Sequence, residues 1–223
     1  MTDYIKPDVA KFREVGTATW QPSLVPGGVH TDLLNLGHIP DPFVSDYELD
    51  VQWVAERDWE YLLTFVMTPE VLTQEHIVLV CDGLDTLAEV TFNDNRLGQT
   101  DNMFRQYRWD VTDLVTGGEN TLHVIFHSTV AHISKKQADL PLRGVAQAIP
   151  GGSYVRKAPC QFGWDWGPQL PPIGFWKEVR LESYTAARLD DVHVRQEHKD
   201  NGCLLYTSPS PRDRTRSRMP SSA

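Results

Sequence analysis

The chain has 223 residues, of which 40% are hydrophobic and 23% are charged, and its formal net charge is −9. These proportions are typical of a globular protein, and the length allows one sizeable domain with a buried core and the start of a second. The negative charge argues against nucleic acid or an anionic membrane surface as the partner.

The first residues contain no apolar stretch of the kind that a secretory signal needs, and the longest apolar runs are far shorter than a membrane span. Cys81, Cys160 and Cys203 are widely spaced and form no CxxC pair, so we expect buried, reduced thiols rather than a disulfide framework. Together these features predict a cytoplasmic protein.

Short strand-like segments separated by Gly, Asn and Asp turns follow one another along most of the chain. Strands are predicted at Leu49–Trp53, Trp59–Met67, Ile77–Cys81, Ala88–Phe92, Phe104–Val111, Leu122–His127, Phe175–Leu181 and Val192–Val194. Helix signals are few, and Thr31–Gly37 is predicted to be a short helix that ends at its glycine. The polar and then Pro/Gly-rich segment Lys135–Gly152 is predicted to be a long loop with a functional or mobile role. This pattern favours an all-β fold, a β-sandwich of jelly-roll type.

The character of the sequence changes at Cys203, after which no periodicity remains. Cys203–Asp213 and Ser217–Ala223 resemble in-frame translations of the two fixed parts of a transposon-type sequencing adapter, and Arg214–Arg216 lies where the variable index would sit. A natural disordered tail is the alternative. We expect residues 203–223 to be adapter-derived and disordered, and the natural sequence to be a fragment that stops near Gly202.

The segment Phe162–Pro168 carries the most chemical information, because two indoles flank one carboxylate. Aromatic faces stack on the apolar face of a pyranose, and a carboxylate accepts hydrogen bonds from sugar hydroxyls. The residues alone leave core packing equally open, since tryptophan is usually buried and aspartate often caps a turn. The flanking Gly163, Gly167 and Pro168 favour a loop at the rim of the fold, where binding sites concentrate.

Several standard signatures are missing from the sequence, among them GxSxG, GxxxxGK[ST], GxGxxG and HExxH. His123 and His127 lie four residues apart in a strand-like run, which favours a structural pair over a metal site. We therefore expect no metal site and no cofactor.

An ordered series of motifs over residues 12–195 resembles the N-terminal sugar-binding domain of the β-mannosidases of glycoside hydrolase family 2. The segments that carry the resemblance are Val25–Leu34, Ile39–Phe43, Val51–Val54, Asp82–Thr86, Asp101–Arg105, Arg156–Cys160, Phe162–Pro168 and Gly174–Trp176. The Asp-Gly-Leu-Asp-Thr turn is shared across the wider family, whereas the Trp-Asp-Trp loop and the Ile-Pro-Asp-Pro-Phe segment point to mannosidases.

The resemblance implies a galactose-binding-domain-like jelly roll over residues 1–185 and the first strand of an immunoglobulin-like domain within residues 186–202. In that family a (β/α)8 barrel carries the two glutamates of a retaining mechanism, so we expect no catalytic residue in this chain and no activity from it alone. Trp164 would pack against a terminal mannose, and Asp165 would accept hydrogen bonds from its hydroxyls. Trp166, Gly163 and Gly167 would support the loop, with Trp166 beneath it.

The implied activity is the hydrolysis of terminal, non-reducing β-D-mannose residues. The implied partners are an oligosaccharide that ends in β-mannose and the missing barrel domain of the same protein. A non-catalytic carbohydrate-binding module is one alternative, and a family 2 glucosaminidase, galactosidase or glucuronidase is another. The coding sequence downstream of Asn201 would separate an enzyme from a binding module.

Overall fold

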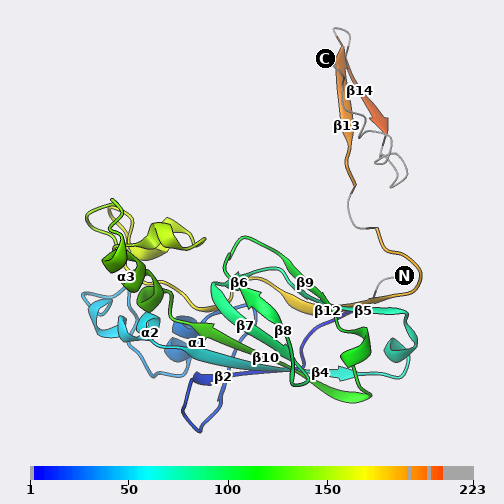
Figure 1. Ribbon diagram of the computed structural model, residues 1–223, viewed down its shortest axis with the longest axis horizontal. Helices are drawn as coiled ribbons and strands as arrows, with labels where there is room; N and C mark the ends of the chain where they lie inside the picture. Colours follow the sequence, from blue (N-terminus) through cyan, green and yellow to red (C-terminus); the bar gives the residue numbers. More distant parts are fainter. Residues whose placement is uncertain (1–2, 190–191, 200–201, 208–223) are drawn as a thin grey trace. The chain divides into compact units, whose positions relative to one another are not determined.

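The computed structural model describes residues 3–189, 192–199 and 202–207 (Figure 1). The chain divides into two compact units, Met1–Thr185 and Ala186–Ala223, and each is described by itself. The larger unit contains two main antiparallel sheets, together with a short two-stranded one.

The six-stranded sheet has the order β3-β2-β4-β10-β7-β8. Its strands are β3 (Gln21–Pro22), β2 (Val9–Glu14), β4 (Trp59–Met67), β10 (Gly118–His127), β7 (Leu87–Phe92) and β8 (Asn95–Thr100). Strands β4 and β10 pair along their full common length, from Met67 opposite Gly118 to Trp59 opposite Phe126. Burial alternates along β10, so one face of this sheet packs into the core.

The four-stranded sheet has the order β1-β12-β5-β9. Its strands are β1 (Asp3–Ile5), β12 (Val179–Tyr184), β5 (His76–Cys81) and β9 (Tyr107–Asp110). Strands β6 (Leu84–Asp85) and β11 (Gly174–Phe175) form the short two-stranded sheet. Strand β6 follows β5 in the sequence, and β11 precedes β12.

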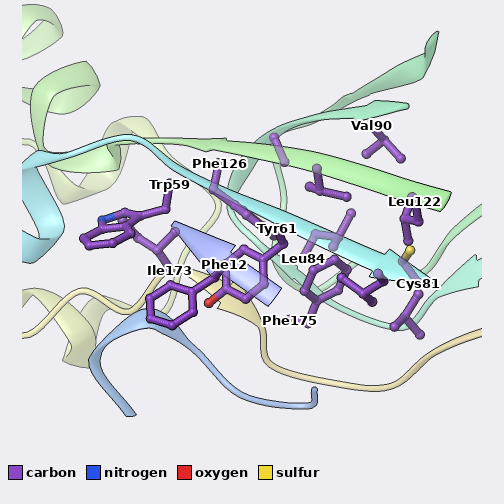
Figure 2. Packing of buried hydrophobic residues seen from close by; sticks show 14 of the residues in the cluster. Phe12, Trp59, Tyr61, Cys81, Leu84, Val90, Leu122, Phe126, Ile173 and Phe175 are labelled. Carbon is purple, nitrogen blue, oxygen red and sulfur yellow. The ribbon is translucent and has the colours of Figure 1, made fainter. Parts of the chain in front are cut away.

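One hydrophobic core contains residues of both main sheets, which makes the unit a β-sandwich (Figure 2). At its centre Tyr61, Phe126 and Phe175 meet edge to face, with ring centroids 5.5 to 5.6 Å apart. Leu79 and Leu181 of the four-stranded sheet belong to the same core. Edge-to-face aromatic contacts add directional packing to hydrophobic burial, so these rings help to fix how the sheets pack. The predicted all-β sandwich is confirmed.

The helical elements are short and lie between the strands. They are α1 (Val29–Asn35), η1 (Leu49–Val51), α2 (Trp53–Glu56), η2 (Val71–Thr73), η3 (Thr112–Leu114), α3 (Thr129–Asp139), η4 (Gly152–Tyr154) and η5 (Pro159–Phe162). Helix α1 confirms the helix predicted at Thr31–Gly37. No helix of the described residues is both long enough and apolar enough to span a membrane.

Three predictions of local structure were wrong. The predicted strand Val192–Val194 is not a strand, because the nearest one, β13 (Arg195–Lys199), begins directly after it. The predicted strand Leu49–Trp53 is helical, because Val51, Val54 and Ala55 form one buried helical face. The predicted loop begins too early, because α3 continues to Asp139. Its N-cap is Ser128, whose Oγ accepts a hydrogen bond from the N–H of Ala131 at 3.0 Å, and this signal was missed.

The smaller unit contains a hairpin in which β13 (Arg195–Lys199) pairs with β14 (Gly202–Thr207). Strand β14 includes residues 203–207, which we expected to be disordered. The run Cys-Leu-Leu-Tyr-Thr has high β propensity, which is sufficient for local pairing. Residues 208–223 lie outside the described residues. The domain boundaries, the immunoglobulin-like strand and the adapter origin of the tail stay predictions.

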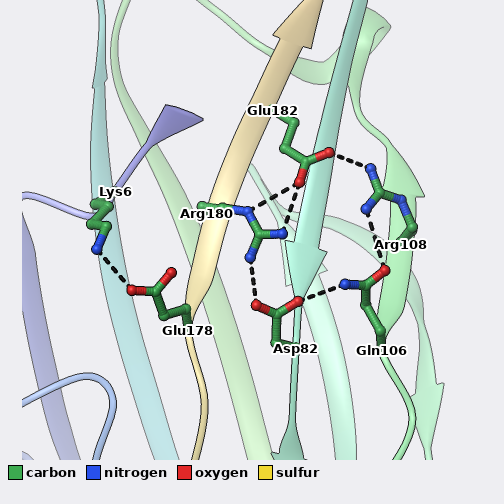
Figure 3. A network of polar contacts seen from close by, with 7 residues as sticks. All are labelled: Lys6, Asp82, Gln106, Arg108, Glu178, Arg180 and Glu182. Carbon is green, nitrogen blue, oxygen red and sulfur yellow. Dashed lines mark hydrogen bonds and ion pairs between the residues drawn. The ribbon is translucent and has the colours of Figure 1, made fainter. Parts of the chain in front are cut away.

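A network of charged side chains crosses the four-stranded sheet (Figure 3). Arg180 donates to Asp82 at 2.5 Å and to Glu182 at 2.8 and 3.0 Å, and Arg108 donates to Glu182 at 2.5 Å. Burial works to raise the pKa of Glu182, but the hydrogen bonds and charges of Arg108 and Arg180 outweigh it and hold the pKa below its ordinary value. Ionised Glu182 therefore stabilises the folded state.

Because the pKa of Glu182 is lowered on folding, its contribution is present above the unfolded pKa and is lost as the pH falls through the folded pKa. We expect Glu182→Gln to lower the free energy of unfolding at about pH 7, and the difference from wild type to shrink as the pH falls to about 3. Urea unfolding at both pH values measures this. Glu178→Gln is the control, since Glu178 pairs with Lys6 in solvent and exposed pairs contribute little. A difference that does not depend on pH would contradict the prediction.

Candidate functional site

The Trp-Asp-Trp segment forms a tight turn that begins directly after η5. Gly163 has φ 106° and Trp164 has φ 47°, both in the left-handed region. The N–H of Gly167 donates to the carbonyl of Gly163 at 2.7 Å and closes the turn. A Cβ on Gly163 would lie 2.8 Å from Cγ of Gln169, so position 163 needs glycine for its backbone angle and for space.

The closed turn directs its three central residues toward solvent. Trp164 is 43% exposed, Trp166 is 82% exposed, and Asp165 is also exposed. Within the described part of the chain, the Asp165 carboxylate has no hydrogen bond or ion pair, so its oxygens are free to accept from a ligand. The structure differs from the expectation that Trp166 packs beneath the loop, because the turn leaves it almost fully in solvent.

A second, smaller core holds the start of this turn. Phe162 is buried with Ile133 of α3 and with Val155. The N–H of Ile149 donates to the carbonyl of Phe162 at 2.8 Å, which ties the loop after α3 to the turn. Helix α3, which the sequence did not predict, therefore positions the candidate site.

A cavity of about 850 Å³ lies next to the turn. Trp164, Phe104 and Arg156 line it, and the segment 142–153 provides much of the rest of the lining. The loop predicted to have a functional role thus borders this cavity over its second half. Pockets of this volume hold small organic ligands, and the mixture of aromatic and polar groups suits a sugar.

A buried ion pair lies beside the cavity. The Nζ of Lys157 donates to Oδ1 of Asp85 at 2.6 Å and to the carbonyl of Pro172 at 2.7 Å, and both charged side chains are almost fully excluded from solvent. Thr86 donates a further hydrogen bond to Asp85. Burial lowers the pKa of Lys157, and the Asp85 carboxylate opposes that shift. The pair joins the Asp82–Thr86 and Arg156–Cys160 motifs. Because Asp85 and Lys157 are 72 residues apart in the sequence, no local pattern predicted their contact.

His30 is a second group that the sequence did not single out. Its two ring nitrogens are buried without a hydrogen-bond partner among the described residues, next to a cavity of about 300 Å³ that Trp176 also lines. Burial and then the charge of Lys157 lower the pKa of His30 to about 4, so the ring is neutral near neutral pH. A neutral imidazole can both donate and accept a hydrogen bond.

The two histidines of β10 contact different carboxylates. His123 Nε2 lies 2.6 Å from Glu60 Oε2, and His127 Nδ1 lies 2.9 Å from Asp58 Oδ2. In residues 3–189, 192–199 and 202–207, no three His, Cys, Asp or Glu side chains are placed to hold a metal ion.

The prediction that the thiols are buried holds for one cysteine of the larger unit and fails for the other. Cys81 is buried, and burial raises the pKa of its thiol. Cys160 is exposed, because it lies in η5 at the edge of the candidate site. Cys203 lies in β14, outside the larger unit.

The sandwich and its loop together define a galactose-binding-like domain that presents an indole and a free carboxylate beside a cavity. The family model described as "Glycosyl hydrolase 2 galactose-binding domain-like" matches residues 11–177, and the chain belongs to this family. This finding confirms the resemblance seen in the sequence.

Several relatives of this chain carry β-mannosidase names. The chain is 36% identical over 181 residues to the "Beta-mannosidase" of Bos taurus, covering 76% of this chain and 20% of the relative. It is 36% identical over 201 residues to "Beta-mannosidase B" of Aspergillus niger, covering 87% and 24%. The crystal structure of the β-D-mannosidase from Dictyoglomus thermophilum superposes with a TM-score of 0.85 at 37% identity, covering 91% and 25%. The chain thus spans about a fifth to a quarter of these proteins.

The ion pair yields a prediction about stability. Lys157→Met leaves the Asp85 carboxylate buried without its cation, which we expect to lower the free energy of unfolding by about 3–5 kcal/mol. The double variant Lys157→Met/Asp85→Asn removes the unpaired charge and should recover part of the loss. Urea unfolding of the two variants measures both effects. A single variant as stable as wild type would show that the pair does not hold the fold.

Proposed function

We propose that this chain forms the N-terminal part of a β-mannosidase that removes terminal β-D-mannose residues from the non-reducing ends of oligosaccharides. In this proposal Trp164 packs against the apolar face of the mannose, and Asp165 accepts hydrogen bonds from its hydroxyls. Both residues form one wall of a pocket, and the rest of the pocket belongs to domains outside this chain.

The observation that carries the proposal is the presentation of Trp164 and Asp165 on a backbone-closed turn beside a cavity. The carboxylate has no partner within the described residues, and the indole is only half exposed, with one part against the cavity. A hydrogen bond to a charged acceptor contributes about 1.5–3 kcal/mol, enough to affect both binding and discrimination between sugars. The names of the relatives support mannose as that sugar.

The chemistry of the proposed reaction needs two further carboxyl groups. A retaining glycosidase uses one as the nucleophile and one as the acid/base, about 5.5 Å apart. We place both glutamates on a (β/α)8 barrel outside this chain, as the family resemblance implies. The share of the relatives that this chain spans leaves room for such a domain. Trp164 and Asp165 would therefore bind and orient the sugar and take no part in proton transfer.

Asp165→Ala tests the proposed sugar contact. A chimera in which residues 3–185 replace the matching part of the Dictyoglomus thermophilum enzyme provides the remaining domains. We expect Asp165→Ala to lower kcat/KM for an aryl β-mannoside about tenfold or more, the equivalent of one charge-assisted hydrogen bond in the transition state. The measurement is aglycone release, with thermal unfolding to check the fold.

The matched control for that variant is Asp113→Ala. Asp113 is an exposed aspartate in η3, away from the candidate site, and the same change there should leave kcat/KM unaltered. A wild-type kcat/KM for the Asp165→Ala chimera would show that Asp165 does not bind the sugar and is only a structural residue of the turn.

The purified 223-residue chain is expected to release no aglycone from a β-mannoside, because we place neither catalytic glutamate in it. A chromogenic assay of the purified chain, with the active chimera as the positive control, measures this. Turnover that copurifies with the chain and disappears in the Asp165→Ala variant would contradict the placement of the glutamates on another domain.

A further inference from the structure

Gln169, two residues beyond Gly167, has both of its backbone polar groups held by side chains from a distant segment. Its N–H donates to Oε1 of Glu48 at 2.7 Å. Its carbonyl accepts from Nε2 of Gln52 at 2.9 Å. The partners lie more than a hundred residues away in the sequence, so the C-terminal end of the turn is fixed by tertiary contacts.

The spacing of Glu48 and Gln52 suits them to act together. The backbone from Glu48 through η1 to Gln52 is helical, so side chains four residues apart lie on the same face. The Nε2 of Gln52 also donates to the carbonyl of Glu48 at 2.8 Å, which orients the amide toward Gln169. Val51 and Val54 are fully buried, so this helical turn is anchored in the main core.

The side chain of Gln169 extends the same connection to the cavity. Its Nε2 donates to the carbonyl of Gln147, in the segment that lines the cavity, at 2.7 Å. Its Cγ lies 2.8 Å from the position that a Cβ on Gly163 would take. Gln169 therefore contacts both the beginning of the turn and the cavity loop.

The turn needs restraint at both ends because its backbone is unfavourable. A positive φ is costly for a residue as bulky as Trp164. The burial of Phe162 restrains the N-terminal end. Among the described residues, the hydrogen bonds to Gln169 are the corresponding restraint after Gly167.

We infer that Glu48 and Gln52 are positioning residues that hold Gln169 and thereby fix the direction of Trp164 and Asp165. The relevance of this inference to the sugar rests on the proposed function. The restraint of Gln169 rests on the hydrogen bonds to Glu48 and Gln52. Neither residue needs to touch the substrate. It also gives a role to Gln52 of the Val51–Val54 motif, which the sequence analysis singled out and the proposed sugar contacts leave unused.

Amide hydrogen exchange of the 223-residue chain tests the mechanics without any assay of activity. Glu48→Leu removes the acceptor and should speed exchange of the Gln169 N–H about tenfold or more, with faster exchange in the segment 163–168. Exchange in β4 and β10 should stay unchanged, which shows that the sandwich is intact. Glu48→Gln keeps a carbonyl oxygen as acceptor and should restore most of the protection.

Glu56→Leu is the matched control, because Glu56 is an exposed glutamate of the neighbouring α2 and makes no hydrogen bond or ion pair within the described residues. Amide hydrogen exchange in the turn of the Glu56→Leu variant should equal that of wild type. Wild-type protection of Gln169 in Glu48→Leu, or faster exchange throughout the sandwich, would overturn the inference.

The chimera tests the consequence for the sugar. Glu48→Leu should lower kcat/KM about fivefold or more, Glu48→Gln should recover most of it, and Glu56→Leu should have no effect. An unchanged kcat/KM in Glu48→Leu, in a chimera that Asp165→Ala impairs, would overturn the positioning role. If Asp165→Ala has no effect, the proposed function fails, while faster exchange confined to the turn would still support the restraint by Glu48.

Discussion

The ion pair between Lys157 and Asp85 is the contact on which the arrangement of the site depends. Both side chains are almost fully excluded from solvent, and among the described residues neither forms a second salt bridge. A buried charge without its partner is strongly unfavourable, so the segments that carry these two residues must stay together. One segment follows β5 in the sandwich, and the other leads directly into η5 and the Trp-Asp-Trp turn. The pair therefore couples the core to the site.

Three sets of contacts restrain the turn. The ion pair holds the chain before η5, the small core around Phe162 holds the start of the turn, and Glu48 with Gln52 holds its end. Among the described residues, the side chains of Trp164 and Asp165 make no hydrogen bond or ion pair, and both are exposed to a ligand. A site that binds a sugar at the edge of a sandwich needs this combination, since a mobile aromatic side chain would lose conformational entropy on binding.

Alternation and turn residues were sufficient to predict most strands of the sandwich, because residues such as Ala88, Val90 and Phe92 alternate in and out of one core. The alternation is misleading at Leu49–Trp53, because the same apolar spacing also fits a helical period, and the burial of Val51 and Val54 favours the helix. The sequence prediction also missed α3, whose cap at Ser128 is a single local signal. The site residues Trp164 and Asp165 were identified from their types and their glycine neighbours.

The all-β class, the family and the segment that carries the candidate sugar contacts can all be predicted from the sequence. These features depend on local patterns and on motifs of a few consecutive residues. The tertiary structure alone decided that Trp166 lies in solvent, that Lys157 pairs with Asp85, and that Glu48 and Gln52 hold Gln169. Each of these depends on which distant segments meet in space and what each meeting buries or leaves exposed. No local pattern in the chain specifies that outcome.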